Sequence, residues 1–281
     1  MTSFLDPELQ QKLVTSRAVW DDLALQYEAY EGIMAQSWGE LVEHMQLQTA
    51  NSVLEVGCGH AHCAETYIPR LRAEASVMVT DFSQTMVDFA KRHLLPFQDR
   101  PGLHIEQLDA LILHSVADKS IDRYLANLTL HLVPDADLML REARRVLQDD
   151  GRVLFLRLVR RSHPPLGVAG FTVWGRVSHC LMFSLRPDGD KTPSFNVGRD
   201  IALLKTRLRE AGFSQHRLWT KQCILELWDA GKVVDFWAKS ERRDVEGKDK
   251  EWAVELRQRV QAAMDEGMPI GLEIVVVIAK P

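Results

Sequence analysis

The stretch SVLEVGCGHAHC, residues 52–63, runs from an apolar segment into two glycines and then into a group of cysteines and histidines. Its first half is typical of a buried strand that ends in a tight turn, because glycines let a backbone approach a ligand without a Cβ atom in the way. Its second half contains four side chains of metal-ligating type, Cys58, His60, His62 and Cys63. The two halves indicate two alternatives, a nucleotide-binding loop and a metal site.

Strand and helix patterns alternate from residue 51 to residue 160, and again near the C-terminal end. Such alternation predicts an α/β fold, with a parallel sheet covered by helices on both faces. Ser83 is expected to cap the helix that follows it, since its hydroxyl can accept a hydrogen bond from a first-turn amide. The expected strands are residues 52–59, 76–82, 103–110, 120–128, 152–159, 213–221 and 270–280.

Three segments lie outside this alternation, and we expect a single domain over residues 1–281. Residues 1–48 are predicted to form an N-terminal helical cap, and residues 49–160 the cofactor-binding core. Residues 161–197 and 223–268 are insertions that we expect to form the substrate pocket. The reason is that ligands of open α/β sheets bind over the carboxyl ends of the strands, where such segments can cover them.

Composition and charge exclude several classes of function. The chain has 281 residues, of which 46% are hydrophobic and 26% charged, and its formal net charge is −5. This acidic balance disfavours a nucleic-acid partner. No apolar run approaches the roughly 20 residues of a membrane-spanning helix, and the N-terminus shows no secretory signal pattern. Four cysteines do not suggest a disulfide framework, so we expect a cytoplasmic protein.

The glycine turn does not fit two common nucleotide-binding loops. Gly57 and Gly59 could open a dinucleotide fingerprint, but the place of its third glycine is taken by His62. No Gly-Lys-Ser/Thr follows, which excludes a P-loop. Three acidic residues instead stand at the ends of successive strands, where a carboxylate can accept hydrogen bonds from a ribose diol. These residues, which together predict an adenosine-bearing ligand, are Glu55, Asp81 and Asp109.

Four segments resemble the successive motifs of class I S-adenosylmethionine-dependent methyltransferases, and especially the ubiquinone/menaquinone-biosynthesis type that acts on small molecules. The resemblance covers about residues 50–160 and implies a Rossmann-like sheet of seven strands in the order 3-2-1-4-5-7-6, with the last strand antiparallel. Ala61 departs from the pattern, because many members have a third glycine there. The segments are VLEVGCGHA at 53–61, VTDFSQTMVDFAKRH at 79–93, LDA at 108–110 and IDRYLANLTLHLVPDADLMLREARRVLQDDGRVLF at 121–155.

The resemblance implies that S-adenosylmethionine is the cofactor and S-adenosylhomocysteine the product. Glu55 and the two glycines after it would hold the methionine part, and Asp81 the ribose hydroxyls. Asp109 would meet the adenine amine, while Asn127 and Leu128 would line the sulfonium side. Trp20 is a further aromatic that could close over the cofactor. The full set of expected cofactor residues is Tyr27, Glu55, Gly57, Cys58, Gly59, Asp81, Phe82, Met86, Asp109, Ala110, Asn127 and Leu128.

Methyl transfer from a sulfonium is an in-line displacement, so proximity and alignment contribute most of the catalysis. Asn127 and His131 are the candidate catalytic residues, with His131 as a base for a hydroxyl acceptor. Aromatic residues of the first insertion, such as Phe171 and Trp174, suit an aromatic or lipophilic small-molecule acceptor. The acceptor atom, O, N or C, is left open.

Two other functions are considered. One is a non-catalytic protein that binds S-adenosylmethionine and serves as a partner or scaffold. The other is a nucleotide-dependent oxidoreductase, which the misplaced third glycine disfavours. A homodimer is considered as the assembly, although no feature of the sequence indicates the oligomeric state.

A metal site is the weaker interpretation of the opening stretch. Structural zinc sites join separate pairs of ligands, whereas Cys58, His60, His62 and Cys63 fall within six residues. We therefore expect no metal. Because a protonated histidine would repel a cationic sulfonium, His60 and His62 should be neutral or turned away from it.

Overall fold

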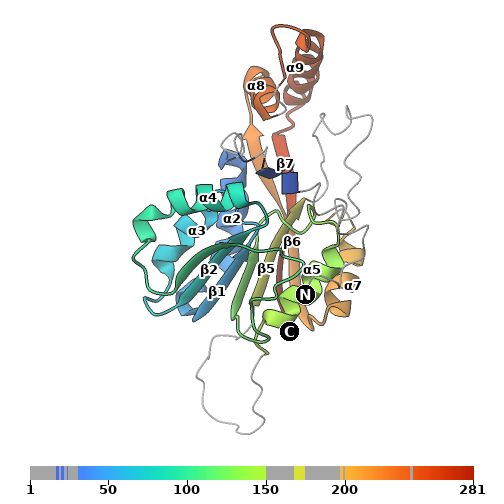
Figure 1. Ribbon diagram of the computed structural model, residues 1–281. Helices are drawn as coiled ribbons and strands as arrows, with labels where there is room; N and C mark the ends of the chain where they lie inside the picture. The colour runs from blue at the N-terminus through green and yellow to red at the C-terminus, as the bar shows by residue number, and fades with distance from the viewer. Residues whose placement is uncertain are drawn as a thin grey trace.

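A computed structural model describes residues 17, 18, 20, 21, 24, 31–149, 168–174, 197, 198, 200–240 and 243–281. Within them, seven strands form one sheet in the order β3-β2-β1-β4-β5-β7-β6 (Figure 1). The neighbours from β3 to β5 pair in parallel, whereas β7 runs antiparallel to both β5 and β6. The expected fold is thereby confirmed. The strands are β1 (Ser52–Val56), β2 (Ser76–Asp81), β3 (Leu103–Gln107), β4 (Arg123–Ala126), β5 (Val168–Trp174), β6 (Gln215–Glu226) and β7 (Ile270–Lys280).

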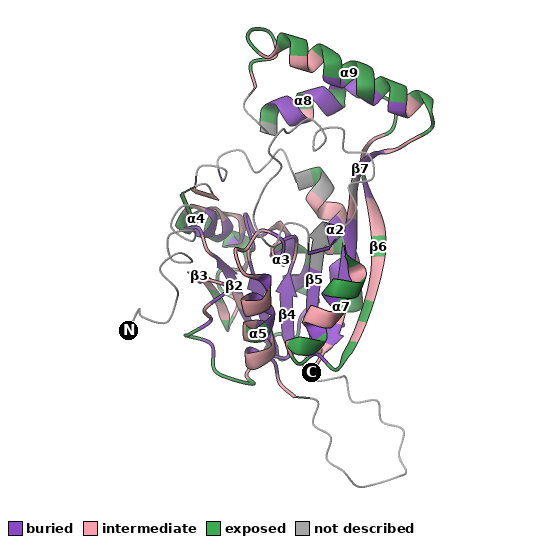
Figure 2. Ribbon diagram, turned by 90° about the vertical axis from the view of Figure 1, so that its right-hand side faces the viewer, coloured by how far each residue is buried: buried purple, intermediate pink, exposed green. Residues whose placement is uncertain are grey.

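Helices cover both faces of the sheet (Figure 1). One face packs against α2, α3 and α4, and the other against α5 and α7. All five residues of β1 are buried between these layers, and the neighbouring strand β4 is likewise buried, as its purple colour in Figure 2 shows. No described helix has the length and apolar character needed to cross a bilayer. The helices are α2 (Glu31–His44), α3 (His62–Tyr67), α4 (Gln84–His93), α5 (Ala136–Val146), α7 (Ile201–Glu210), α8 (Ala230–Ser240) and α9 (Lys250–Asp265), with 3-10 turns at Leu47–Thr49, Ile68–Arg70 and Leu95–Phe97.

Local capping signals set the starts of two helices. Ser83 caps α4, because its hydroxyl oxygen accepts the amide hydrogen of Met86 at 3.1 Å. Asp135 caps α5 in the same way, with its carboxylate 2.9 Å from the amide nitrogen of Leu138. Each cap satisfies an amide that has no partner inside its own helix. The cap expected at Ser83 is therefore confirmed.

The position of the fifth strand differs from the prediction. We expected it at residues 152–159, which lie outside the described residues, but the strand that pairs with β4 is Val168–Trp174. This segment was expected in the insertion 161–197. The physical reason is non-local, because Gly170 allows α2 to lie directly on the strand. A Cβ atom at Gly170 would fall 2.6 Å from the sulfur of Met45, and helical or strand periodicity carries no information about such a contact.

β6 and β7 extend beyond the rest of the sheet and carry a two-helix lobe made of α8 and α9 (Figure 2). Residues 223–226, expected in a helical insertion, belong to β6. The lobe has its own buried cluster, which includes Val233, Trp237 and Leu256. Since β5 and β6 both run antiparallel to β7, β6 runs parallel to β5 and the lobe begins at the carboxyl edge. Open α/β sheets bind ligands at this edge.

A buried ion pair fixes the amino ends of β1 and β4. The carboxylate of Asp122 accepts the amide hydrogens of Asn51 at 2.7 Å and Ser52 at 3.1 Å. Arg123 donates from Nε to the carbonyl oxygen of Met45 at 2.7 Å. The side chains of the pair are only 1% and 2% exposed and approach to 4.0 Å. The pair and its hydrogen bonds therefore connect the end of α2 with two central strands.

Replacing Arg123 by Met should destabilise the fold by about 3–5 kcal/mol, because it leaves the Asp122 carboxylate buried without its partner. The free energy of unfolding, measured by urea denaturation, tests this. Arg209→Met on the exposed side of α7 is the control and should change it by less than about 0.5 kcal/mol. Equal effects of the two substitutions would contradict the role of the ion pair.

Candidate functional site

A cavity opens at the carboxyl ends of β1, β2 and β4, with an empty space of about 690 Å³ when the part open to solvent is included. Segments far apart in the sequence meet there, as expected for parallel strands that end at one edge. Most of the residues expected to contact a cofactor are part of its wall. The lining residues are Trp20, Gly57, Gly59, Asp81, Phe82, Met86, Leu108, Asp109, Ala110, Leu111, Asn127, Leu128, Thr129, Leu132, Val133 and Pro134.

The turn after β1 contains three residues with positive φ, namely Gly57 at 63°, Gly59 at 56° and Ala61 at 66°. Gly57 is required sterically, because a Cβ atom there would lie 2.4 Å from the hydroxyl oxygen of Thr129. Ala61 adopts the left-handed conformation in spite of its Cβ, at a cost of roughly 1–2 kcal/mol. This cost explains why a glycine would be favoured at position 61.

Asp81 connects this turn to the end of β2. Its carboxylate accepts the amide hydrogens of Gly59 and Ser83, both at 2.9 Å. Burial raises the pKa of Asp81 to about 6, although these hydrogen bonds act in the opposite direction. An ionised carboxylate has about four lone-pair positions. It can therefore accept further hydrogen bonds from a ligand while it holds the turn.

Asp109, Ala110, Phe82 and Met86 form another wall of the larger cavity. The carboxylate of Asp109 accepts a backbone amide at 2.9 Å, and burial raises its pKa. The guanidinium of Arg17 lies 4.3 Å above the centre of the Phe82 ring. Apolar side chains beside a carboxylate suit a flat heterocycle that carries an amino group.

A second, smaller cavity adjoins the first, because Gly57 and Asn127 line both. Glu55 lies in its wall, is 1% exposed, and accepts a hydrogen bond from the Tyr67 hydroxyl at 2.9 Å. Burial raises the pKa of Glu55 to about 7. Glu55 and Cys58 thus face the smaller cavity rather than the larger one. The other lining residues are Met34, Trp38, His62 and Cys63.

Asn127 stands where the two cavities meet. Its side-chain oxygen accepts a hydrogen bond of 2.9 Å from the hydroxyl of Ser37 on α2. Leu128, the next residue, has a φ of 51°, which is unusual for a residue with a branched side chain. Strained backbone of this kind is concentrated at functional sites. The end of β4 is therefore shaped for the cavity rather than for regular structure.

The structure separates the two expected catalytic residues. Asn127 lines both cavities, whereas His131 lines neither and is fully buried. Burial lowers the pKa of His131 to about 3, so its imidazole is a poor proton acceptor at neutral pH. This position does not support the role of catalytic base, which stays a prediction. The sequence could place His131 near the strand end, but not show that the turn directs its side chain into the core.

Tyr27, also expected at the cofactor, lies outside the described residues. His60 is turned away from both cavities, as expected. Its Nε2 atom lies 2.9 Å from the carbonyl oxygen of Ala24, and its ring stacks on Phe89 with 4.3 Å between centroids. His62 differs, since it lines the smaller cavity.

Sequence reasoning missed part of the wall. Met34 and Trp38 show only the helical spacing of core residues, although both reach the smaller cavity. Phe171, assigned to the acceptor side, is instead a core residue in contact with Tyr124 and Phe213. Four of the missed residues follow β4, and their position directly after a strand end is the feature of the sequence that could have indicated that they line the cavity. They are Thr129, Leu132, Val133 and Pro134.

Comparison with known proteins agrees with this geometry. Residues 54–155 match a family described as a methyltransferase domain. The demethylmenaquinone methyltransferase of Lactobacillus johnsonii is 28% identical over 120 residues, which cover 43% of this chain and 49% of that protein. The ubiquinone/menaquinone biosynthesis C-methyltransferase of Hahella chejuensis is 24% identical over 204 residues, covering 69% of this chain and 81% of that protein.

A solved structure has a similar fold. The phosphoethanolamine N-methyltransferase 2 of Haemonchus contortus, in complex with phosphomonomethylethanolamine and S-adenosylhomocysteine, aligns with a TM-score of 0.55 and 13% identity over 90% of this chain and 56% of that chain. The chain thus spans about half the length of the first curated relative and most of the second. Residues 54–155 therefore form a methyltransferase domain, and the motifs, sheet order and relatives make the chain similar to the class I S-adenosylmethionine-dependent methyltransferases of the ubiquinone/menaquinone-biosynthesis-like, small-molecule type.

Proposed function

We propose that this chain transfers a methyl group from S-adenosylmethionine to a small-molecule acceptor. The observation that carries the proposal is the pair of adjoining cavities that share Gly57 and Asn127. In this arrangement the adenosine half lies in the larger cavity, between Asp81 and Asp109. The methionine half crosses Gly57 toward Glu55, and the sulfonium comes to lie beside Asn127, where both cavities are open.

The charges of the two cavities support a cationic cofactor. Their described lining contains Glu55, Asp81 and Asp109 but neither lysine nor arginine, although the charge of Arg17, which lies over the Phe82 ring, acts to lower the pKa of Asp109. The sulfonium and ammonium groups of S-adenosylmethionine are attracted by these carboxylates, and the attraction is stronger away from bulk water. Transfer of the methyl group removes the sulfonium charge. The product S-adenosylhomocysteine is then held less strongly, which favours its release.

The acceptor is best matched by an aromatic or lipophilic molecule. Met34 and Trp38 lie in the wall of the smaller cavity, and Leu128, Leu132 and Val133 in that of the larger. Walls of this kind bind apolar ligands, with a few polar groups to orient them. The names of two relatives, which specify demethylmenaquinone and ubiquinone/menaquinone biosynthesis, support the same class. The acceptor atom is an O, N or C atom.

Catalysis would rest on positioning. An in-line displacement needs the nucleophile close to the methyl carbon and opposite the sulfur, which is a proximity effect. The amide of Asn127, oriented by Ser37, is placed to align the acceptor or the sulfonium. α2 and the lobe of α8 and α9 would limit the access of water at the carboxyl edge. A cytoplasmic location, the absence of a nucleic-acid partner and a homodimer stay predictions.

Transfer of a labelled methyl group from S-adenosylmethionine to a panel of quinol, phenol, fatty-acid and amine acceptors tests the proposed function. We expect transfer to at least one aromatic or lipophilic compound, with inhibition by S-adenosylhomocysteine. Cofactor binding without transfer to any acceptor would instead favour the alternative, a non-catalytic partner protein that binds S-adenosylmethionine.

Replacing Asp81 by Asn should lower the affinity for S-adenosylmethionine about 10-fold to 100-fold, because hydrogen bonds to a charged group contribute about 1.5–3 kcal/mol. Isothermal titration calorimetry measures the change. Asp88→Asn is the matched control, since Asp88 is an aspartate of α4 outside the cavity lining. An unchanged affinity of Asp81→Asn for S-adenosylmethionine would contradict the assignment of Asp81 to the ribose site.

Cofactor affinity should fall as the pH decreases through about 7 and about 6, the pKa values of Glu55 and Asp81 in the free protein. A cationic ligand favours the ionised carboxylates and therefore lowers both pKa values. Binding then releases protons between about pH 6 and about pH 7, and the affinity reaches its maximum only above this pH range. Calorimetry from about pH 5 to about pH 8, in buffers of different ionisation enthalpy, counts the protons.

The matched variant is Glu55→Gln. It should remove the change in cofactor affinity near pH 7 and weaken cofactor binding at pH values above about 7. Without cofactor the same change should raise the melting temperature at about pH 8, because ionisation of buried Glu55 destabilises the fold as the pH rises from 4.5 toward 7. A pH-independent affinity in the unsubstituted protein would refute the carboxylate assignment.

Asn127→Ala should lower the turnover number about 10-fold to 100-fold with a smaller change in cofactor affinity, since alignment matters most at the transition state. His131→Gln should leave turnover within about threefold, because its imidazole does not reach the reacting atoms and is not a base at neutral pH. Steady-state kinetics and melting temperatures of both variants are measured together. A larger loss of turnover in a folded His131→Gln protein would restore the histidine as the catalytic residue.

A further inference from the structure

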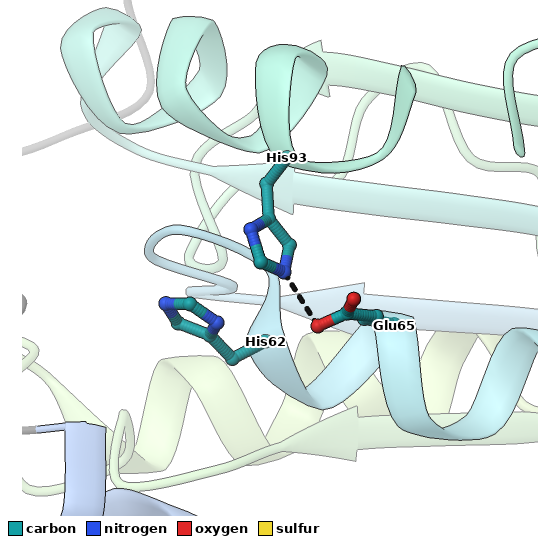
Figure 3. Close-up of side chains that lie close together, drawn as sticks. All are labelled: His62, Glu65 and His93. Atoms are coloured by element: carbon teal, nitrogen blue, oxygen red, sulfur yellow. Dashed lines mark hydrogen bonds and ion pairs between the residues drawn. The ribbon is translucent and has the colours of Figure 1, made fainter. Parts of the chain in front are cut away.

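A cluster of metal-ligating side chains lies beside the smaller cavity. His62 and Glu65 come from α3, and His93 from the last turn of α4. One ligand atom of each lies within 4.8 Å of the other two, and Figure 3 shows the three side chains gathered between the two helices. We propose that His62, Glu65 and His93 bind a divalent transition-metal ion of the zinc class.

The observed distances suit such an ion. His93 Nε2 lies 2.7 Å from a carboxylate oxygen of Glu65, and the rings of His62 and His93 are 4.3 Å apart at 69°. Zinc bonds to histidine nitrogen and carboxylate oxygen of about 2.0–2.2 Å place tetrahedral ligands about 3.3 Å from one another. The distances between the ligand atoms of His62, Glu65 and His93 range from 2.7 Å to at most 4.8 Å, and the tetrahedral spacing falls within this range. Small side-chain rotations would therefore complete the site.

The ligand types and their exposure also fit. Two imidazoles and one carboxylate are ligands that zinc and its neighbours prefer. Their single negative charge is offset by the ion. Glu65 is 49% exposed and His93 27% exposed, so a hydrated ion has a path to the site. A water molecule can occupy the fourth position.

The local sequence explains why the ligands converge. His62 and Glu65 are three residues apart, which places them on the same side of a helix. α3 begins directly after Ala61 and the glycine turn, while α4 begins at the Ser83 cap. An ion held by these three side chains would join α3 to α4. It would thus brace the helix that follows the cofactor turn without entering the larger cavity.

The other metal-ligating residues of the opening stretch fit this role less well. Cys58 and Cys63 are buried, and among the described residues neither belongs to a cluster of three metal-ligating atoms. His60 is directed to the carbonyl oxygen of Ala24. His62 is therefore the member of that stretch with suitable partners, and these come from farther along the chain. The metal site does not depend on methyl transfer.

Calorimetric titration of the full chain with zinc chloride, after removal of bound metal by a chelator, tests the proposal. We expect saturable binding and a rise in melting temperature with zinc. His62→Ala and His93→Ala should each lower this affinity at least about tenfold, and Glu65→Gln should also weaken it. The matched control is His44→Ala, because His44 pairs with Glu40 at 3.8 Å and belongs to no such cluster among the described residues.

Two outcomes would overturn the site. One is an equal zinc affinity in the unsubstituted protein and in folded His62→Ala and His93→Ala variants. The other is a thiolate-to-metal charge-transfer band in the absorption spectrum of the cobalt-substituted protein, which would assign the ion to cysteines. Affinity for S-adenosylmethionine, measured with and without chelator, is a separate readout. It distinguishes failure of the metal site from failure of the proposed methyl transfer.

Discussion

The hydrogen bond of 2.9 Å from the Gly59 amide to the Asp81 carboxylate is the constraint on which the cofactor site depends. It fixes the turn after β1, in which Gly57 and Gly59 adopt positive φ angles, against the end of β2. The same carboxylate accepts the amide of Ser83, whose hydroxyl caps α4. One buried acid therefore orders a turn, a strand end and a helix start before any ligand arrives.

The parts of the fold that depend on local chemistry and simple topology could be predicted from the sequence. Alternating strands and helices predict the parallel sheet, and an acid at the end of each early strand predicts that Asp81 and Asp109 meet at one edge. The Ser83 cap needs only a hydroxyl before an amphipathic helix. These features require no knowledge of distant side chains, which is why the predicted and observed positions agree.

The features that the sequence did not predict correctly depend on distant contacts. Gly170 of β5 lies under Leu41 of α2 and under Met45, which follows that helix, whereas the apolar run upstream has a similar local pattern. His131 follows the strand end as expected, yet the backbone turn places it in the core. The sequence also did not indicate that the site is divided into two cavities, with Glu55 in the wall of the smaller one.

The two most buried acids of the site, Glu55 and Asp81, also favour a cationic ligand such as the proposed methyl donor. The raised pKa values of Glu55 and Asp81 have burial as their largest cause, and the described cavity walls contain no lysine or arginine to offset it. A cationic cofactor reduces this cost by supplying positive charge where water is scarce. After transfer the sulfur is neutral, and part of that compensation disappears. Under the proposed function, these carboxylates would therefore hold the methyl donor more strongly than its product, without touching the acceptor.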